Sequence, residues 1–467
     1  MSPKLATDSA LRPRYDAAPS ARIARSTAAA QGAVMDLREF DQWFAERRAA
    51  HPFRVGTIPF AELEGWRTQE GTGNLVHRSG RFFSVEGLRV TVDAGGGGWH
   101  QPIIRQPEIG ILGILVKEFD GVLHCLMQAK MEPGNPNLLQ LSPTVQATRS
   151  NYTKVHGGAD VKYLEYFTRP GSARVLADVL QSEHGSWFHR KHNRNMIVET
   201  TADVPPHEDF RWLTFGQIAR LLRLDNVVNM DSRTVLSCAP AADAEARSAA
   251  LHSDAELAFW LTGTRSRHGV RTERVPLAGL PDWERDAHTI HRADGRYFDV
   301  VAASVRAGSR EVTHWTQPLI RPRGQGVVAM LTRRIDGVPH LLVHARTEGG
   351  LREAVELSPT VMCTPDNYGG PAEAGRPAFL DLVLRADASR IRYEALHSEE
   401  GGRFLDAVSR YLLIEADEGE APRDEPPGYR WMTAGQLSRF IQRGHSVNVQ
   451  ARTLAACLAA AEFGDHD

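Results

Sequence analysis

The chain has 467 residues, of which 42% are hydrophobic and 24% are charged, a composition that suits a globular protein of two or three domains. Its formal net charge of -2 excludes the strong positive field that nucleic acid or an acidic membrane surface attracts. The cysteines are Cys125, Cys238, Cys363 and Cys457; without a CxxC pair they indicate neither a disulfide framework nor a thiolate zinc site.

The N-terminal segment, residues 1–35, is rich in alanine, serine and arginine and lacks the apolar core of a signal peptide. We expect it to be a disordered tail. The best candidate for a membrane span is the short run Ile109 to Val116, well below the roughly 20 apolar residues that a span needs. A cytoplasmic location is therefore expected.

Two β-rich runs, Ile109 to Phe119 and Val122 to Met131, flank the dipeptide Asp120-Gly121. Asp-Gly tolerates the positive φ angles of a tight turn, so these residues predict a β-hairpin. The same dipeptide returns at Asp336-Gly337.

Helices are predicted at two kinds of position. Ala173 to Ser182 carries apolar residues at helical spacing, which places Glu183 at the end of a helix. Thr214 with Gln217, and Thr433 with Gln436, have the spacing of a capping box, in which the two side chains reciprocally cap the start of a helix.

The chain contains a long internal repeat. Leu141-Ser142-Pro143-Thr144 recurs 216 positions later as Leu357-Ser358-Pro359-Thr360, and the same displacement relates Ser182-Glu183 to Ser398-Glu399. After a three-residue insertion the displacement becomes 219, which relates Arg233 to Arg452. An internal duplication is thus indicated, with a first repeat over residues 36–245 and a second over residues 246–467.

Three blocks carry a resemblance to a known family. They run from Pro133 to Tyr152, from Gln181 to Phe188, and over Asn193-Arg194-Asn195. They closely resemble the NDP-hexose 2,3-dehydratases, and the resemblance covers residues 38 to 460. It implies an α+β fold of two tandem Nudix-like α/β/α sandwich domains, a homodimer, and work in deoxysugar pathways for natural-product glycosides such as antibiotics.

A functional Nudix hydrolase places several magnesium-binding carboxylates along one helix. When Gly185 is aligned with the final glycine of that motif, Glu183 is the one acid retained, and the other expected acids fall on residues such as Ser182 and Val179. One glutamate is a poor basis for a magnesium site. No metal site is therefore predicted, and diphosphate hydrolysis is disfavoured.

The family resemblance implies a lyase that removes water from C2 and C3 of an NDP-4-keto-6-deoxyhexose, in particular dTDP-4-keto-6-deoxy-D-glucose. The C3 hydrogen lies next to a carbonyl, so a base can remove it if the enolate is stabilised. Loss of the C2 hydroxyl then gives an enol, which becomes a 3,4-diketo-2,6-dideoxy sugar. No redox cofactor is required, and the sequence contains no Gly-x-Gly-x-x-Gly dinucleotide motif.

The candidate catalytic residues are Glu183, Tyr152 and His184. Glu183 is the candidate base because it occurs in both repeats, although a carboxylate at the end of a helix also serves to bond backbone amides. Tyr152 and His184 are candidate proton donors. A packed tyrosine is the alternative for Tyr152, and the second repeat has Glu400 where the first has His184.

Substrate contacts are expected from aromatic, polar and basic side chains near these blocks. Basic groups suit a diphosphate, polar groups suit a sugar, and a tryptophan can stack on a base. The candidates are Trp99, Gln101, Arg105, Thr144, Gln146, Thr148, Arg149, Asn151, Lys154, Arg190, Lys191 and Arg194. A solvated basic face, a core tryptophan and turn-forming polar residues are the corresponding structural alternatives.

Two other functions remain open from the sequence, a non-catalytic nucleotide-sugar binding protein and a Nudix-like hydrolase of nucleotide diphosphates. The polar blocks of the two repeats differ, which argues against simple binding at two similar sites. The first repeat has Glu132-Pro133-Gly134-Asn135-Pro136 where the second has Glu348-Gly349-Gly350-Leu351-Arg352. The expected partners are the nucleotide-sugar substrate and, because the diketo product is reactive, an NADPH-dependent 3-ketoreductase.

Overall fold

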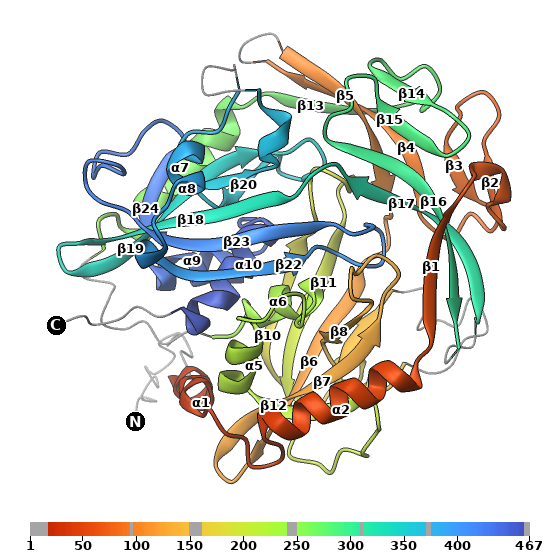
Figure 1. Ribbon diagram of the computed structural model, residues 1–467. Helices are drawn as coiled ribbons and strands as arrows, with labels where there is room; N and C mark the ends of the chain where they lie inside the picture. Colours follow the sequence, from red (N-terminus) through yellow and green to blue (C-terminus); the bar gives the residue numbers. More distant parts are fainter. Residues whose placement is uncertain are drawn as a thin grey trace, which may run out of the picture.

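The computed structural model describes residues 17–93, 97–148, 161–240, 250–308, 312–369 and 375–461. Its two largest sheets, one from each repeat, have seven strands each in the described residues (Figure 1). The first contains β6 (Gly110–Phe119), β7 (Val122–Met131), β8 (Leu139–Ser142), β9 (Val145–Ala147), β10 (Arg174–Ser182), β11 (His192–Glu199) and β12 (Phe210–Thr214). The second contains β18 (Gly326–Ile335), β19 (Val338–Thr347), β20 (Val355–Ser358), β21 (Val361–Cys363), β22 (Ile391–Ser398), β23 (Val408–Glu415) and β24 (Tyr429–Met432).

The two large sheets have the same strand order, β10-β11-β6-β7-β12 and β22-β23-β18-β19-β24, with a parallel pair at β11/β6 and at β23/β18. The remaining pairs in each sheet are antiparallel. This repeated, mixed α+β arrangement agrees with the duplication that the sequence predicts.

The predicted hairpins are confirmed. β6 and β7 are joined by Asp120 and Gly121, whose φ angles are 47° and 78°, and β18 and β19 are joined by Asp336 and Gly337, at 51° and 81°. Both turn residues are therefore in the positive-φ region that Asp-Gly favours in two-residue turns.

The predicted helix over Ala173 to Ser182 is wrong. The segment is strand β10, paired antiparallel with β11 from Arg174 to Ser182. Its burial alternates, with Ala177 and Val179 inside and Val175 and Leu180 exposed. Pairing with β11 makes this segment a strand. As a strand it places every second side chain against the core and forms backbone hydrogen bonds with β11, which a helix over the same residues could not form. Glu183 thus follows a strand.

Both capping boxes are confirmed. Thr214 accepts from the backbone N–H of Gln217 at the start of α5 (Phe215–Leu221), and Thr433 does the same with Gln436 at the start of α9 (Ala434–Gln442). Each glutamine side chain in turn accepts from the backbone N–H of its threonine. α5 and α9 are followed by α6 (Met230–Leu236) and α10 (Val449–Cys457).

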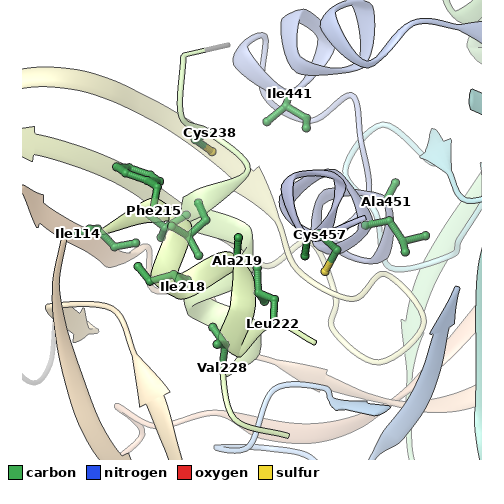
Figure 2. Packing of buried hydrophobic residues seen from close by; sticks show 14 of the residues in the cluster. Ile114, Phe215, Ile218, Ala219, Leu222, Val228, Cys238, Ile441, Ala451 and Cys457 are labelled. Atoms are coloured by element: carbon green, nitrogen blue, oxygen red, sulfur yellow. The ribbon is translucent and has the colours of Figure 1, made fainter. Parts of the chain in front are cut away.

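One hydrophobic core joins the repeats. It combines the inner faces of both large sheets with α5, α6, α9 and α10. Figure 2 shows Ala219 and Leu222 of the first repeat beside Cys457 of the second, with Phe215 and Ile218 on the side of Ile114. The outer faces of the sheets are covered by α4 (Glu165–Thr168) and by α8 (Leu380–Leu384) with η3 (Ala388–Arg390) nearby.

Two smaller sheets exchange one strand between the repeats. β1 (Phe53–Ile58) of the first repeat pairs with β16 (Phe298–Ala307) of the second, and β13 (Val270–Val275) of the second pairs with β4 (Ser84–Val92) of the first. The first of these sheets also contains β14 (Trp283–Arg285), β15 (Thr289–Arg292) and β17 (His314–Pro322); the other contains β2 (Trp66–Thr68), β3 (Leu75–His77) and β5 (Gly97–Arg105). In Figure 1 the red strand β1 lies beside β16.

Part of the segment expected to be a disordered tail is helical. α1 (Ala17–Ala28) lies on the first large sheet, where the Ser26 hydroxyl donates to the carbonyl of Leu123 at 2.5 Å and Arg22 pairs with Glu199 at 2.5 Å. These long-range contacts stabilise a helix that local composition does not reveal. Two longer helices, α2 (Leu37–Ala50) and α7 (Asp254–Arg267), precede the exchanged strands β1 and β13, and short 3-10 turns occur at η1 (Phe60–Glu62), η2 (Pro365–Asn367) and η4 (Leu458–Ala460). Across the described residues, no helix has the length and apolarity to span a bilayer.

Candidate active site

Glu183 lies where β10 ends, close to the junction of the two repeats. Its backbone N–H donates to the carbonyl of Lys191 at 3.0 Å, and its Oε1 accepts from Nδ2 of Asn193 on β11 at 2.6 Å. The second oxygen, Oε2, is buried and has no hydrogen-bond partner. One oxygen is therefore fixed, and the other is available to a ligand.

His184 connects the equivalent glutamates of the two repeats. Its Nε2 is 2.8 Å from Oε2 of Glu399, and its Nδ1 is 3.8 Å from Oε2 of Glu183. Burial lowers the pKa of His184, but the nearby carboxylates of Glu183 and Glu399, the second of which is hydrogen-bonded to it, outweigh burial and raise that pKa to about 9. His184 is thus a cation at neutral pH, between two carboxylates.

Both carboxylate oxygens of Glu399 accept hydrogen bonds. It accepts from the hydroxyls of Ser409 at 2.9 Å and Tyr411 at 2.9 Å, besides its contact with His184. Burial acts to raise the pKa of Glu399, but His184 and its other donors outweigh that effect and lower it. With its oxygens occupied, Glu399 is placed to hold His184.

Three more acids surround Glu183: Glu132, Asp231 and Glu400. Burial raises the pKa of Asp231 well above its usual range, and the charges of Glu183, Glu132 and Glu400 raise it further. Glu132 follows β7, Asp231 lies in the first turn of α6, and Glu400 comes from the second repeat. Four carboxyl groups, three from the first repeat and Glu400 from the second, therefore form an acidic cluster at the junction of the repeats.

Basic side chains offset part of this negative charge. Lys191 is buried and its Nζ donates to the carbonyl of Glu108. Burial lowers the pKa of Lys191 to about 8, with Glu183 acting in the opposite direction. Lys130 donates to Glu132 at 3.3 Å, and Arg403 of the second repeat bonds Gln106 at 3.2 Å. These cations are suited to a developing enolate or a diphosphate.

The equivalent place in the second repeat has a different set of side chains. Gln450 stands where the first repeat has Asp231, Met362 replaces Gln146, and Ala407 replaces Lys191. Glu348, the equivalent of Glu132, accepts from Ser186 at 3.0 Å and from Asn448 at 3.1 Å. The second repeat has the buried Glu356 where the first has Gln140, but it lacks equivalents of Asp231 and Lys191.

An open pocket of about 560 Å³ lies elsewhere in the second repeat. Its arginines Arg321 and Arg323 pair with the buried Asp299 at 3.0 and 2.7 Å. The full lining is Gly295, Arg296, Asp299, Arg321, Arg323, Gly324, Asp366 and Asn367. Within the described ranges, no group of three or more His, Cys, Asp or Glu side chains is arranged to hold a metal ion.

The predicted contact residues on β5 lie beside the loop that carries Glu183. Trp99 is partly exposed, and its Nε1 donates to Gln101 Oε1 at 2.7 Å. Gln101 in turn donates to the carbonyl of Ser186 at 2.6 Å, and half-buried Arg105 lies at the end of β5.

Gln146 reaches the acidic pocket, where its Nε2 donates to Glu132 Oε1 at 2.6 Å. Thr144 is used differently, since its hydroxyl donates to the carbonyl of Leu126 and accepts from the backbone N–H of Leu115 at 2.8 Å. It joins β6 to β7. Thr148 is half-buried beyond β9.

The basic residues predicted to contact the substrate lie in different places in the structure. Lys191 is in the pocket, but the guanidinium of Arg194 pairs with Asp178 on the neighbouring strand at 2.5 Å, and its counterpart Arg410 pairs with Glu394 at 2.6 Å. Exposed Arg190 is held through its backbone, which donates to Gly350 at 2.6 Å. Four candidates lie outside the described residues: Arg149, Asn151, Tyr152 and Lys154.

The sequence was compared with known proteins. The profile of the NDP-hexose 2,3-dehydratase family matches twice, over residues 37–239 and 254–458. The chain belongs to this family. It is 58% identical to a dTDP-4-dehydro-6-deoxy-α-D-glucopyranose 2,3-dehydratase of Amycolatopsis orientalis, over 97% of this chain and 96% of the relative. It is 50% identical to a protein of that name from Saccharopolyspora spinosa (94% of each) and 51% identical to one from Streptomyces violaceoruber (91% and 97%).

Several residues of this family member's pocket were missed from the sequence: Glu132, Asp231, Glu400 and Arg403. Glu132 had a signal, because it recurs as Glu348 at the same displacement of 216 as Glu183 and Glu399. Asp231 and Arg403 have no acidic or basic counterpart, and Glu400 belongs to the other repeat. Glu132 and Asp231 come from the same repeat as Glu183, whereas the packing of the two repeats brings Glu400 and Arg403 to this dehydratase's site.

Proposed function

We propose that this chain removes water from C2 and C3 of dTDP-4-keto-6-deoxy-D-glucose to give the dTDP-linked 3,4-diketo-2,6-dideoxy sugar. The main support is Oε2 of Glu183, which is buried, accepts no hydrogen bond, lies 3.8 Å from His184 and is close to a buried lysine and a cluster of carboxyl groups. The names of the relatives support the same substrate. A non-catalytic binding protein and a nucleotide-diphosphate hydrolase are the alternatives that this function displaces.

In the proposed mechanism, Glu183 is the base that takes the C3 proton. Asn193 fixes one of its oxygens, which leaves the other to face the sugar. Lys191 supplies positive charge as the enolate forms on O4. His184, a cation bonded to Glu399, lies 3.8 Å from Glu183 and helps to hold it in place. Tyr152, outside the described residues, remains a proposed proton donor.

We propose that the candidates from the sequence that lie near Glu183 contact the nucleotide and the diphosphate. Trp99 and Gln101 lie beside the loop that carries Glu183, and Gln146 donates a hydrogen bond to Glu132. Arg105, Thr148, Arg149, Asn151, Lys154 and Arg190 remain candidates for phosphate or sugar. Arg194 and Thr144 have structural partners, so their proposed part is to hold β10 to β11 and β6 to β7.

We further propose that each large sheet with its helices is a Nudix-like α/β/α sandwich, since helices cover both of its faces. Because Glu183 follows a strand, it does not correspond to a carboxylate of a Nudix helix. We also propose a cytoplasmic homodimer in antibiotic deoxysugar biosynthesis, with an NADPH-dependent 3-ketoreductase consuming the reactive diketone.

The direct test is incubation with dTDP-4-keto-6-deoxyglucose. The expected product has lost one water and, as a 1,2-diketone, condenses with an aromatic 1,2-diamine. Release of dTMP indicates hydrolysis instead, and binding without turnover indicates a passive module. Either result contradicts the proposal.

Glu183→Gln is expected to lower kcat by about 10²–10⁴-fold, because a positioned general base contributes this much. In deuterated water the variant also fails to exchange the C3 hydrogen. Glu394→Gln, which removes an exposed acid from β22, is the matched control and retains activity. Unchanged turnover in Glu183→Gln excludes Glu183 as the base.

A further inference from the structure

A loop of the second repeat, residues 399–407, is docked into the first repeat. Gly134 donates its N–H to the carbonyl of Gly401 at 2.7 Å and accepts from the backbone N–H of Asp406 at 2.8 Å. The guanidinium of Arg403 lies 4.2 Å from the ring centre of Phe83. The loop is therefore fixed against the first repeat, next to the acidic cluster.

Glu400 is the acid that this loop brings to the pocket. Its Oε1 accepts from the backbone N–H of Gly402 at 2.9 Å, which fixes the carboxyl group. Its Oε2 is buried and has no hydrogen-bond partner. This is the same arrangement as in Glu183, with one oxygen held and the other unoccupied, on the opposite side of the repeat junction.

The surroundings of Glu400 favour its protonated form. Burial is the main cause, the charges of Glu132 and Glu183 act in the same direction, and Arg403 opposes them; together they raise the pKa of Glu400 to about 7. The two carboxyl groups thus have different neighbours: Glu183 lies 3.8 Å from His184, whereas burial and the charges of Glu132 and Glu183 outweigh Arg403 at Glu400.

The equivalent position in the first repeat cannot do the same for the second pocket. It is His184, whose Nε2 is bonded to Glu399 and whose Nδ1 faces Glu183. His184 is therefore committed to holding two carboxylates. The second repeat has a free carboxyl oxygen of its own on the buried Glu356, but its Glu399 has both oxygens occupied. In the described residues, Glu183 and Glu400 are thus the pair in which a glutamate that occurs in both repeats and a second acid each keep one oxygen free, near Asp231 and Lys191.

We propose that Glu400 is the general acid that protonates the departing C2 hydroxyl, so that the second repeat supplies a catalytic residue to the site of the first. This inference rests on the proposed dehydration of a 4-keto sugar. It assigns the acid to a residue that touches the reacting hydroxyl, and leaves His184 as a positioning residue for Glu183.

The proton balance closes with these two residues. Glu183 takes the C3 proton, and the C3–H electron pair forms the enolate across C3 and C4. The enolate then expels the C2 oxygen, which leaves with the C2–O electron pair and the proton of Glu400 as water. In the resulting C2–C3 enol, protonated Glu183 returns its proton to C2 and Glu400 removes the O3 proton, which gives the 3-ketone and restores both residues.

The test compares two leaving groups in Glu400→Gln. Fluoride departs as an anion with little help from an acid, so the variant is expected to lose about 10²–10⁴-fold with the natural substrate but less than about tenfold with the 2-deoxy-2-fluoro analogue. In deuterated water it still exchanges the C3 hydrogen, whereas Glu183→Gln does not. The fluoro reaction also reports that the variant is folded.

Asp406→Asn is the matched control, because it changes an exposed acid of the same loop at a φ of 52° that asparagine tolerates. It retains wild-type rates on both substrates. Equal losses with both leaving groups, absent C3 exchange or full dehydration in Glu400→Gln would each overturn the proposal. If the wild-type protein itself dehydrates neither substrate, the proposed function fails instead.

Discussion

At the scale of single residues, the site depends on a buried row of charge, Glu183–His184–Glu399. Removal of one member of a buried ion pair leaves the other charge uncompensated, which costs more than loss of a surface pair. Because the pKa of His184 is raised from 6.5 to about 9 in the folded chain, this stability depends on pH.

Glu399→Gln tests the row. The stabilisation that His184 gains from Glu399 is complete below pH 6.5 and disappears as the pH rises through about 9. We expect the variant to lose about 3 kcal/mol of unfolding free energy at pH 6. The loss shrinks at pH 9.5, as measured by urea denaturation. Glu394→Gln, at an exposed pair, shows no such pH dependence; a loss of equal size at both pH values contradicts a charged His184.

The pH dependence of the rate belongs to the same scale. If Glu400 must hold a proton, kcat/KM of the wild-type protein falls as the pH rises through about 7. With the 2-fluoro analogue this limb is expected to be absent, while a second decrease near pH 8, from Lys191, remains for both substrates. A profile that is flat between pH 6 and 7.5 with the natural substrate speaks against Glu400.

At the scale of elements, the loops after β10 and β22 cross reciprocally to the other repeat. Gly350 donates to Gly185 at 2.7 Å, as Gly134 does to Gly401. A Cβ at Gly134 would lie 1.5 Å from the carbonyl oxygen of Phe404. Gly134 and Gly350 are thus needed because each lets its own backbone approach the backbone of the other repeat closely.

Gly134→Ala is expected to push the 399–407 loop away from the first repeat and to lower the free energy of unfolding by about 1–3 kcal/mol through overpacking. Because Glu400 moves with the loop, kcat is also expected to fall. Thermal denaturation and steady-state kinetics measure the two effects. At Gly419 a Cβ meets nothing within 4 Å, so Gly419→Ala serves as the control. A Gly134→Ala protein with wild-type stability and rate would show that the loop contact is dispensable.

At the scale of the whole molecule, the repeats are interlocked. Besides the exchanged strands, buried Arg233 donates to the carbonyl of Ser398 at 2.5 Å, and Arg452 donates to that of Ser182 at 2.5 Å. Each arginine thus fixes the strand end that precedes the other repeat's glutamate. The second repeat is a structural part of the first repeat's site.

Residues 1–245 and 246–467 produced as separate chains are therefore expected not to fold, because each exposes half of a shared core and an unpaired strand edge. When co-expressed, the halves should assemble and recover dehydration. Cooperative thermal unfolding of either half alone would contradict this interlocking.

The sequence by itself determined what short-range chemistry fixes. Asp120-Gly121 specified a hairpin and Thr214 with Gln217 a helix start, since both depend on neighbours within a few residues. The constant displacement revealed the duplication, and with it Glu183 and Glu399 as a pair. These features need no knowledge of how distant segments meet.

Only the tertiary structure decided the remainder. Arg174 to Ser182 is a strand because β11 pairs with it, and α1 is ordered by contacts with residues about 100 or more positions away. Glu400 reaches Glu183 because the repeats exchange strands and share a core, and its raised pKa comes from burial created by that packing. Such effects arise from long-range association, which local sequence patterns do not encode.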